Sequence, residues 1–266
     1  MSEPGAGWDC HVHVFDATRP TRAGHYRPAH RPLDAIEAEA AAQGVGHLVL
    51  VQPSVYGTDH SLLLQALQAS PGRHRGVVVL PDEVDGSELQ RLHDLGVRGA
   101  RLNLVSPVGE SAPLARRFEH LAPLLARRGW HLQWYVRPEQ LAEVASLHAA
   151  GAPTCVLDHL GGMHAGIGDD HPGWRALAQL ADAGAWVKLS GWYRLRACAP
   201  YRELQPVLRQ VLAMFQGRWL WGSDWPHTGF DAPALPGYAS TFAPVVEALG
   251  QAGALAGRDT PAPIYR

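Results

Sequence analysis

The sequence predicts an α/β fold, a single-domain (β/α)8 barrel of the TIM type that spans residues 1–266. Three observations predict it: short apolar segments recur eight times, amphipathic segments separate them, and a length of 266 residues suits one barrel. Because strand and helix patterns alternate, the strands should be parallel and joined by crossover helices. Eight such units in one chain favour a closed barrel over an open doubly wound sheet.

The expected strands are short runs rich in apolar residues that end in glycine, proline or polar residues. In chain order they lie near Trp8–His13, His47–Ser54, Arg75–Pro81, Val97–Leu104, His131–Val136, Thr154–His159, Ala185–Ser190 and Trp219–Asp224.

Helical patterns with apolar residues three and four apart lie between these strands. One helix is expected at Ala115–Arg128. Another is expected at Pro138–Ala150, with proline in its first turn and Gly151 as its C-cap.

The longer connections all follow strands. In a parallel barrel such loops emerge at the C-terminal face, where barrel enzymes have their active sites. These connections are Asp16–Pro32, Val105–Pro113, Gly161–Pro172, Gly191–Pro200 and Trp225–Gly237.

Composition excludes several classes of function. A net charge of −2 offers no basic surface for nucleic acid, and no apolar run is long enough for a membrane span. Residues Met1–Trp8 lack a charged and an apolar targeting region. The odd number and wide spacing of Cys10, Cys155 and Cys198 do not suggest a disulfide framework. We therefore expect a cytoplasmic protein; the sequence does not indicate its oligomeric state.

His11 and His13 end the first expected strand. On a strand, residues two apart point the same way, about 6.7 Å apart along the chain, whereas on a helix they would diverge. Two surface histidines at a strand end are the plain alternative. The other strand ends argue against it, because His159 ends the sixth strand and Asp224 the eighth, so that the barrel brings all four side chains to one mouth.

Further polar residues end other strands on one alternate face. Because barrel interiors favour branched apolar residues and buried polar groups are costly without partners, packing alone does not account for them. A shared active site accounts for these polar residues. They are Gln52 and Ser54, Arg101 and Asn103, Gln133 and Tyr135, and Lys188 and Ser190.

Several strand ends together resemble the amidohydrolase superfamily, and within it the branch that contains 2-pyrone-4,6-dicarboxylate lactonase and sugar-acid lactonases. The resemblance covers the chain from the first strand to the tail. Its motifs are His11-Val12-His13, the strand Val97–Asn103, Leu157–Gly161, Val187–Gly191, Trp221–His227 and the tail Thr260–Tyr265.

The resemblance raises the question of a metal. Binuclear members carry a bridging Lys or Glu on the fourth strand and a histidine on the fifth, where this chain has Arg101 and Tyr135. A cation beside Arg101 is electrostatically disfavoured, so a binuclear site is not expected. The resemblance to the pyrone dicarboxylate lactonase implies catalysis without a metal, which we favour. A single zinc on His11, His13 and Asp224, with or without His159, is the alternative.

The implied reaction is hydrolysis of a carboxylated lactone, in the catabolism of aromatic or sugar acids. It needs an activated water, stabilisation of an oxyanion and a proton for the leaving oxygen. Asp224 is the expected base, and His11, His13 and His159 are expected to hold the carbonyl.

The expected substrate contacts come from other strand ends and loops. Arg101 can hold a substrate carboxylate with its planar fork. Arg194 or Arg196 could provide a second such contact or be solvated loop residues. The remaining candidates for contact with the substrate are Tyr135, Ser54 and His227.

Two other functions stay open. One is a zinc-dependent decarboxylase of the same superfamily, which would hold a metal and release CO2. The other is a non-catalytic barrel that binds a small acid, which would need arginines but has no use for Asp224 beside three histidines. A phosphoesterase should supply many more Asp and His ligands than this chain does.

Overall fold

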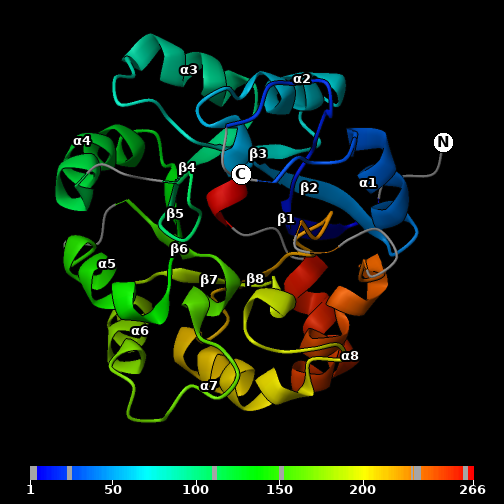
Figure 1. Cartoon of the computed structure of the whole chain (residues 1–266), viewed down its shortest axis with the longest axis vertical. Helices are drawn as coiled ribbons and strands as arrows, with labels where there is room; N and C mark the ends of the chain where they lie inside the picture. Colours follow the sequence, from blue (N-terminus) through cyan, green and yellow to red (C-terminus); the bar gives the residue numbers. More distant parts are fainter. Residues whose placement is uncertain are drawn as a thin grey trace.

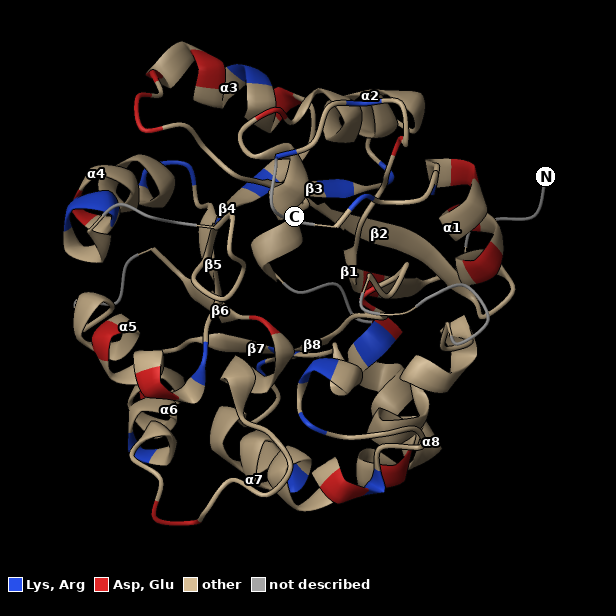
Figure 2. Cartoon of the chain, viewed as in Figure 1, with Lys and Arg blue, Asp and Glu red and all other residues tan. Residues whose placement is uncertain are grey.

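The computed structural model describes residues 5–22, 26–109, 113–149, 153–228, 230, 235–259 and 263–266. Eight parallel strands form one sheet in chain order, from β1 to β8, and the helices lie around it as an outer ring (Figure 1). The predicted (β/α)8 barrel is confirmed, with a strand at each expected place. Acidic and basic residues are interspersed along the outer helices (Figure 2).

The strands are β1 (Gly7–Val12), β2 (Val45–Val51), β3 (Arg75–Val78), β4 (Val97–Asn103), β5 (His131–Tyr135), β6 (Cys155–Leu157), β7 (Trp186–Leu189) and β8 (Trp219–Trp221). Each strand ends one to three residues before its expected last residue, and the backbone gives the reason for two of them, β6 and β8. His159 and Asp224 have positive φ values of 48° and 60°, which a β-strand does not accommodate. The strands therefore stop short, and these two side chains leave the sheet in tight turns.

The helices are α1 (Leu33–Ala41), α2 (Ser61–Ala69), α3 (Gly86–Asp94), α4 (Leu114–Ala126), α5 (Leu141–Leu147), α6 (Gly173–Asp182), α7 (Gln205–Phe215) and α8 (Ala243–Asp259). Helix α4 confirms the first expected helix. The second divides into a 3₁₀ turn, η2 (Pro138–Gln140), and α5. Its expected end at Ala150 and the C-cap Gly151 lie outside the described residues, as do Thr260, Pro261 and Ala262 of the tail motif. Among the described helices, none is both long and apolar enough to cross a membrane.

The chain's last turn closes the N-terminal end of the barrel. This 3₁₀ turn, η8 (Pro263–Tyr265), carries Tyr265 into the apolar cluster inside the sheet, and the C-terminus lies at the centre of the ring of helices (Figure 1). The Tyr265 ring stacks on Trp8 with a centroid distance of 6.1 Å. Its carbonyl oxygen accepts a hydrogen bond of 2.7 Å from Nε of Arg75. The tail thus seals the end of the barrel opposite the strand ends that carry the candidate site.

The Tyr265 plug predicts a pair of contrasting variants. Tyr265→Ala should lower the free energy of unfolding by about 3 kcal/mol or more, since it removes a buried aromatic ring. Tyr265→Phe should leave it unchanged or raise it by about 1 kcal/mol, because the buried hydroxyl has no hydrogen-bond partner in the described part of the chain. Urea unfolding of both variants measures the difference. A destabilised Phe variant would contradict this account of the hydroxyl.

Candidate active site

A cavity of about 220 Å³ opens at the C-terminal ends of the strands. It brings together most of the side chains that the sequence selected: His13, Ser54, Arg101, Tyr135, His159, Arg194 and Asp224 line it. The rest of its wall is Tyr26, Pro53, Asn103, Val105, Ser106, Pro107 and Thr228.

Asp224 is the centre of the cluster. Its Oδ1 atom lies 3.6 Å from Nε2 of His11 and 3.5 Å from Nε2 of His13, and Nε2 of His159 is 4.0 Å away. These separations are too long for good hydrogen bonds. Within the described part of the chain, neither Oδ1 of Asp224 nor Nε2 of His11 has a hydrogen-bond partner.

The second oxygen of Asp224 is fully engaged. Its Oδ2 atom accepts hydrogen bonds from the Tyr193 hydroxyl at 2.7 Å and from Nε of Arg194 at 2.8 Å. Burial alone would raise the pKa of Asp224, but the Arg194 guanidinium beside it holds that pKa well below its usual value. Asp224 is therefore an ionised carboxylate at neutral pH, with Oδ1 directed at the histidines.

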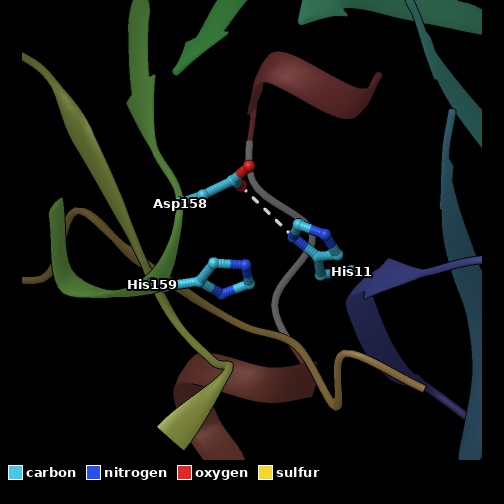
Figure 3. Close-up of side chains that lie close together, drawn as sticks. All are labelled: His11, Asp158 and His159. Carbon is cyan, nitrogen blue, oxygen red and sulfur yellow. Dashed lines mark ion pairs between the residues drawn. The ribbon is translucent and has the colours of Figure 1, made fainter. Parts of the chain in front are cut away.

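The contacts on the far side of two rings bear on what His13 and His11 present to Asp224. Nδ1 of His13 lies 2.7 Å from the carbonyl oxygen of Val51, and a carbonyl only accepts, so Nδ1 carries the proton. Nδ1 of His11 faces Oδ1 of Asp158 at 3.2 Å (Figure 3). Burial lowers the pKa of His11 well below its usual value, so its ring is neutral. A neutral ring that carries its proton on Nδ1 directs the lone pair of Nε2 toward Asp224.

Asp158, which the sequence analysis did not select, holds together the layer beneath the cavity. Its Oδ2 atom accepts hydrogen bonds from Nε of Arg101 at 2.9 Å and from Gln133 at 3.0 Å. Its Oδ1 atom faces His11 and, at 3.6 Å, Nζ of Lys188. Burial alone would raise the pKa of Asp158, but His11, Arg101 and Lys188 hold it well below its usual value. The only signal in the sequence was its position directly before His159.

His159 is oriented from β7. Its Nδ1 atom lies 2.9 Å from the Ser190 hydroxyl, and its ring meets Tyr135 edge to face at a centroid distance of 4.9 Å. A Cβ atom at Gly191 would come within 2.3 Å of the ring. Only glycine therefore fits there beside the histidine.

Two arginines lie close to the ring of Tyr135. Their guanidinium carbons are 5.3 Å (Arg101) and 6.0 Å (Arg194) from the centroid of its ring. The Nε atoms are held by Asp158 and Asp224, and one terminal nitrogen of Arg194 donates to Thr228 at 3.0 Å. The terminal nitrogens of Arg101 make no hydrogen bond to any residue that the structure describes. Both guanidinium groups line the cavity and can meet an anion there.

Three of the selected residues lie outside the cavity wall. His11 is fully buried beneath it and reaches the cluster only through Nε2. His227 is buried, with Nε2 at 3.1 Å from the Ser223 carbonyl oxygen. Arg196 is exposed and lines a neighbouring pocket with Arg137. The geometry therefore gives no direct substrate contact in this cavity to Arg196 or His227.

The donor atoms fit a single divalent cation. Those of His11, His13 and Asp224 lie within 4.8 Å of one another. Two of the separations, 3.5 and 3.6 Å, are close to the edge of about 3.4 Å that a tetrahedral zinc site with N and O ligands has. The contacts to Val51 and Asp158 orient the imidazoles as outer partners do in zinc sites.

Comparison with known proteins places the whole fold in one family. Residues 8–248 match the family model described as amidohydrolase, Amidohydro_2. A 2-pyrone-4,6-dicarboxylate hydrolase of Comamonas testosteroni is 32% identical over 241 residues, 84% of this chain and 78% of that protein. A 4-sulfomuconolactone hydrolase of Rhizobium radiobacter is 29% identical over 239 residues, 88% and 80% of the two chains. The crystal structure of a Pseudomonas putida protein, a candidate 2-pyrone-4,6-dicarboxylic acid hydrolase, superposes with a TM-score of 0.85 at 30% identity, covering 99% of this chain and 98% of that one.

The Asp158 network predicts a coupled defect. Asp158→Asn should raise KM and lower kcat together, because the same carboxylate holds Arg101 at the cavity wall and fixes the proton of His11. It should also destabilise the fold by about 3–5 kcal/mol, since Arg101 and Lys188 lose their buried counter-charge.

Steady-state kinetics and thermal unfolding test this, with Glu37→Gln as the control. Glu37 pairs with buried His74 at 2.9 Å at the N-terminal end of β3, away from the cavity. That variant should lose stability and keep its kinetic constants. If Asp158→Asn behaved in the same way, Asp158 would have no part in substrate binding or turnover.

Proposed function

Because the chain belongs to the amidohydrolase family, we propose that it is a hydrolase that opens a small anionic lactone in the cavity at the mouth of the barrel. One observation carries the proposal: an ionised carboxylate, Asp224, faces the same cavity as Arg101 and Arg194, which lie close to the ring of Tyr135. Relatives named for the hydrolysis of 2-pyrone-4,6-dicarboxylate and 4-sulfomuconolactone support a lactone as the substrate class.

The reaction follows from the residue types. A water molecule attacks the carbonyl carbon of the cyclic ester while Asp224 accepts its proton. The bond between that carbon and the ring oxygen breaks, and the proton passes from Asp224 to the leaving oxygen. The product carries one additional carboxylate and one hydroxyl group. His13 and His159, both in the cavity wall, hold the carbonyl oxygen, and His11 supports Asp224 from below.

The substrate class follows from the charges around the cavity. Arg101 offers two terminal nitrogens, which suit a bidentate carboxylate contact. Arg194 supplies a second positive group, and Tyr135 and Ser54 supply hydroxyl groups. We therefore propose a lactone that carries one or two carboxylates.

Two candidate hydrolases remain, which differ in whether a metal is bound. The first is the metal-free hydrolase that the sequence favours, in which Asp224 activates the water and the histidines hold the carbonyl without a metal. The second is a hydrolase with one zinc on His11, His13 and Asp224, supported by the two facing lone pairs and the unpartnered Oδ1. When bound, zinc would polarise the ester carbonyl as a Lewis acid. A zinc-dependent decarboxylase with the same ligands would differ in releasing CO2.

We also propose that the enzyme works in the cytoplasm, in the breakdown of aromatic or sugar acids. Its three cysteines are free, and one of them, Cys198, is exposed. A free, exposed thiol suits a reducing compartment.

Arg101→Lys tests the carboxylate contact. An ammonium group cannot make the bidentate contact, so KM for a dicarboxylate lactone should rise about 10- to 100-fold while kcat changes less. Arg196→Lys is the matched control, because Arg196 lies outside the cavity wall, and its kinetics should equal those of the wild type. A panel of charged and neutral lactones measures both variants. Equal KM values, or a preference for neutral lactones, would remove Arg101 from substrate binding.

Asp224→Asn tests the base. It keeps the shape but cannot accept a proton, so hydrolysis should fall by roughly 10²- to 10⁴-fold. Because the pKa of Asp224 is depressed, the carboxylate loses its negative charge only below the ordinary value of 3.8. In the wild type, kcat/KM should therefore show no loss attributable to Asp224 between neutral pH and that value.

Metal analysis of the same two proteins separates the candidates. For a zinc enzyme, Asp224→Asn should lower the zinc content, and chelation should abolish wild-type activity. For the metal-free enzyme, both proteins should lack stoichiometric metal and chelation should have no effect. A variant that hydrolyses lactones at nearly the wild-type rate would exclude Asp224 as the base.

A further inference from the structure

The barrel closes between β8 and β1 by an irregular seam. Within the described residues the two strands share a single bridge, between Val12 and Trp225, rather than a regular ladder. Two backbone hydrogen bonds of 2.9 Å join them, from the amide of Asp224 to the carbonyl of His11 and from the amide of His13 to the carbonyl of Trp225. The two histidines whose Nε2 atoms lie 3.5–3.6 Å from Oδ1 of Asp224 thus come from one side of this seam, and Asp224 comes from the other.

Strand β1 is also irregular toward β2. Asp9 pairs with Leu48 and Val12 with Leu50, so that three steps on β1 match two on β2. Such a bulge redirects side chains and leaves a backbone amide outside the ladder. The amide of His11, which lies in the bulge, donates instead to Oδ1 of Asp9 at 3.1 Å.

The same oxygen of Asp9 serves the other strand. The amide of Ser223, directly before Asp224, donates to Oδ1 of Asp9 at 2.9 Å. The other oxygen, Oδ2, accepts a hydrogen bond of 2.9 Å from the hydroxyl of Tyr238, in the 3₁₀ turn η7 (Tyr238–Thr241). Asp9 is completely buried, so water cannot take its place as the acceptor.

We propose that Asp9 is a positioning residue for the hydrolysis: its Oδ1 atom sets the distance between His11 and His13 on β1 and Asp224 after β8. The inference rests on the proposed function, since it assigns a role in the same reaction. This one atom accepts hydrogen bonds from the amide of His11 on β1 and from the amide of Ser223, which directly precedes Asp224.

Two features of the segment after β8 show that this spacing has to be held. Asp224 has a φ of 60°, a left-handed conformation that is unfavourable for a residue with a side chain and persists where neighbouring contacts impose it. At Gly222 a Cβ atom would lie 2.5 Å from Cβ of His11. The two strands therefore approach more closely than any side chain at position 222 would allow.

The role needs an acceptor atom rather than a charge. The donors to Asp9 are all neutral groups: the backbone amides of His11 and Ser223 and the hydroxyl of Tyr238. Asparagine has a carbonyl oxygen for the two amides and an NH2 group that can donate to the Tyr238 oxygen. Asp9→Asn should therefore preserve the seam, whereas Asp9→Ala leaves two buried amides without an acceptor.

The test compares four proteins: the wild type, Asp9→Ala, Asp9→Asn and Tyr238→Phe. Each is assayed with the lactone that the wild type hydrolyses fastest in a panel, and each is unfolded thermally. Asp9→Ala should lose about 10- to 100-fold in kcat with KM within about twofold, because small misplacements of reacting groups cost that much and Arg101 lies away from the seam on β4. Asp9→Asn should recover kcat. Tyr238→Phe, which removes the donor to Oδ2 alone, should lower the melting temperature and leave kcat unchanged.

The outcomes separate this inference from the proposed function. If no lactone is hydrolysed by the wild type, the proposed function fails. If a lactone is hydrolysed and Asp9→Ala keeps its kcat, the positioning role is wrong. An Asp9→Asn variant as slow as Asp9→Ala would also overturn it, because the charge would then be the essential property. Should Asp9→Ala not fold, Asp9→Ser replaces it, since the shorter hydroxyl side chain cannot accept from both amides.

Discussion

The site depends on one buried carboxylate that is ionised in a place where burial opposes its charge. Arg194 and Tyr193 compensate one oxygen of Asp224, and the other faces the Nε2 atoms of the histidines. A buried charge is costly unless partners surround it. Because those partners come from β1, β6 and the turn after β7, the ionised state of Asp224 requires the whole mouth of the barrel to be assembled. The folded barrel therefore provides the ionised Asp224 that the reaction needs.

Asp158 forms a second centre of the same kind beneath the first, and His11 joins them. One nitrogen of His11 faces Asp158 and the other faces Asp224. Each carboxylate also holds the Nε atom of one cavity arginine, Arg101 or Arg194. The arginines thus reach the cavity already oriented, and their remaining nitrogens can bind an anion with little further ordering. Such pre-orientation reduces the entropy cost of binding a substrate.

The sequence predicted the architecture and most of the cavity wall, for a definite reason. Alternation of apolar strands and amphipathic helices is a local pattern, and in a parallel barrel it determines where strand ends meet. The network below the mouth could not be predicted in this way. The sequence indicated Lys188 only as a polar residue at a strand end, Asp158 follows directly after β6, and the partners of both are distant in sequence. Tyr193 and Asp9 were missed for the same reason. His227 and Arg196 were selected because they lie in loops, and the hydrophobic pattern of a sequence does not predict the backbone path of a loop. His227 is buried against a backbone carbonyl, whereas Arg196 is exposed.

The seam between β8 and β1 shows why regular structure gives way at this point. A continuous ladder would hold both strands in extended conformation, and an extended Asp224 would direct its carboxylate along the normal alternation of the strand. The left-handed conformation of Asp224 and the bulge in β1 both depart from that geometry, and together they bring His11, His13 and Asp224 to one point. Each departure leaves backbone amides without ladder partners, which is a cost that a buried acceptor must offset. The side chain of Asp9 supplies that acceptor, so the irregular backbone at the seam depends on the buried carboxylate of Asp9.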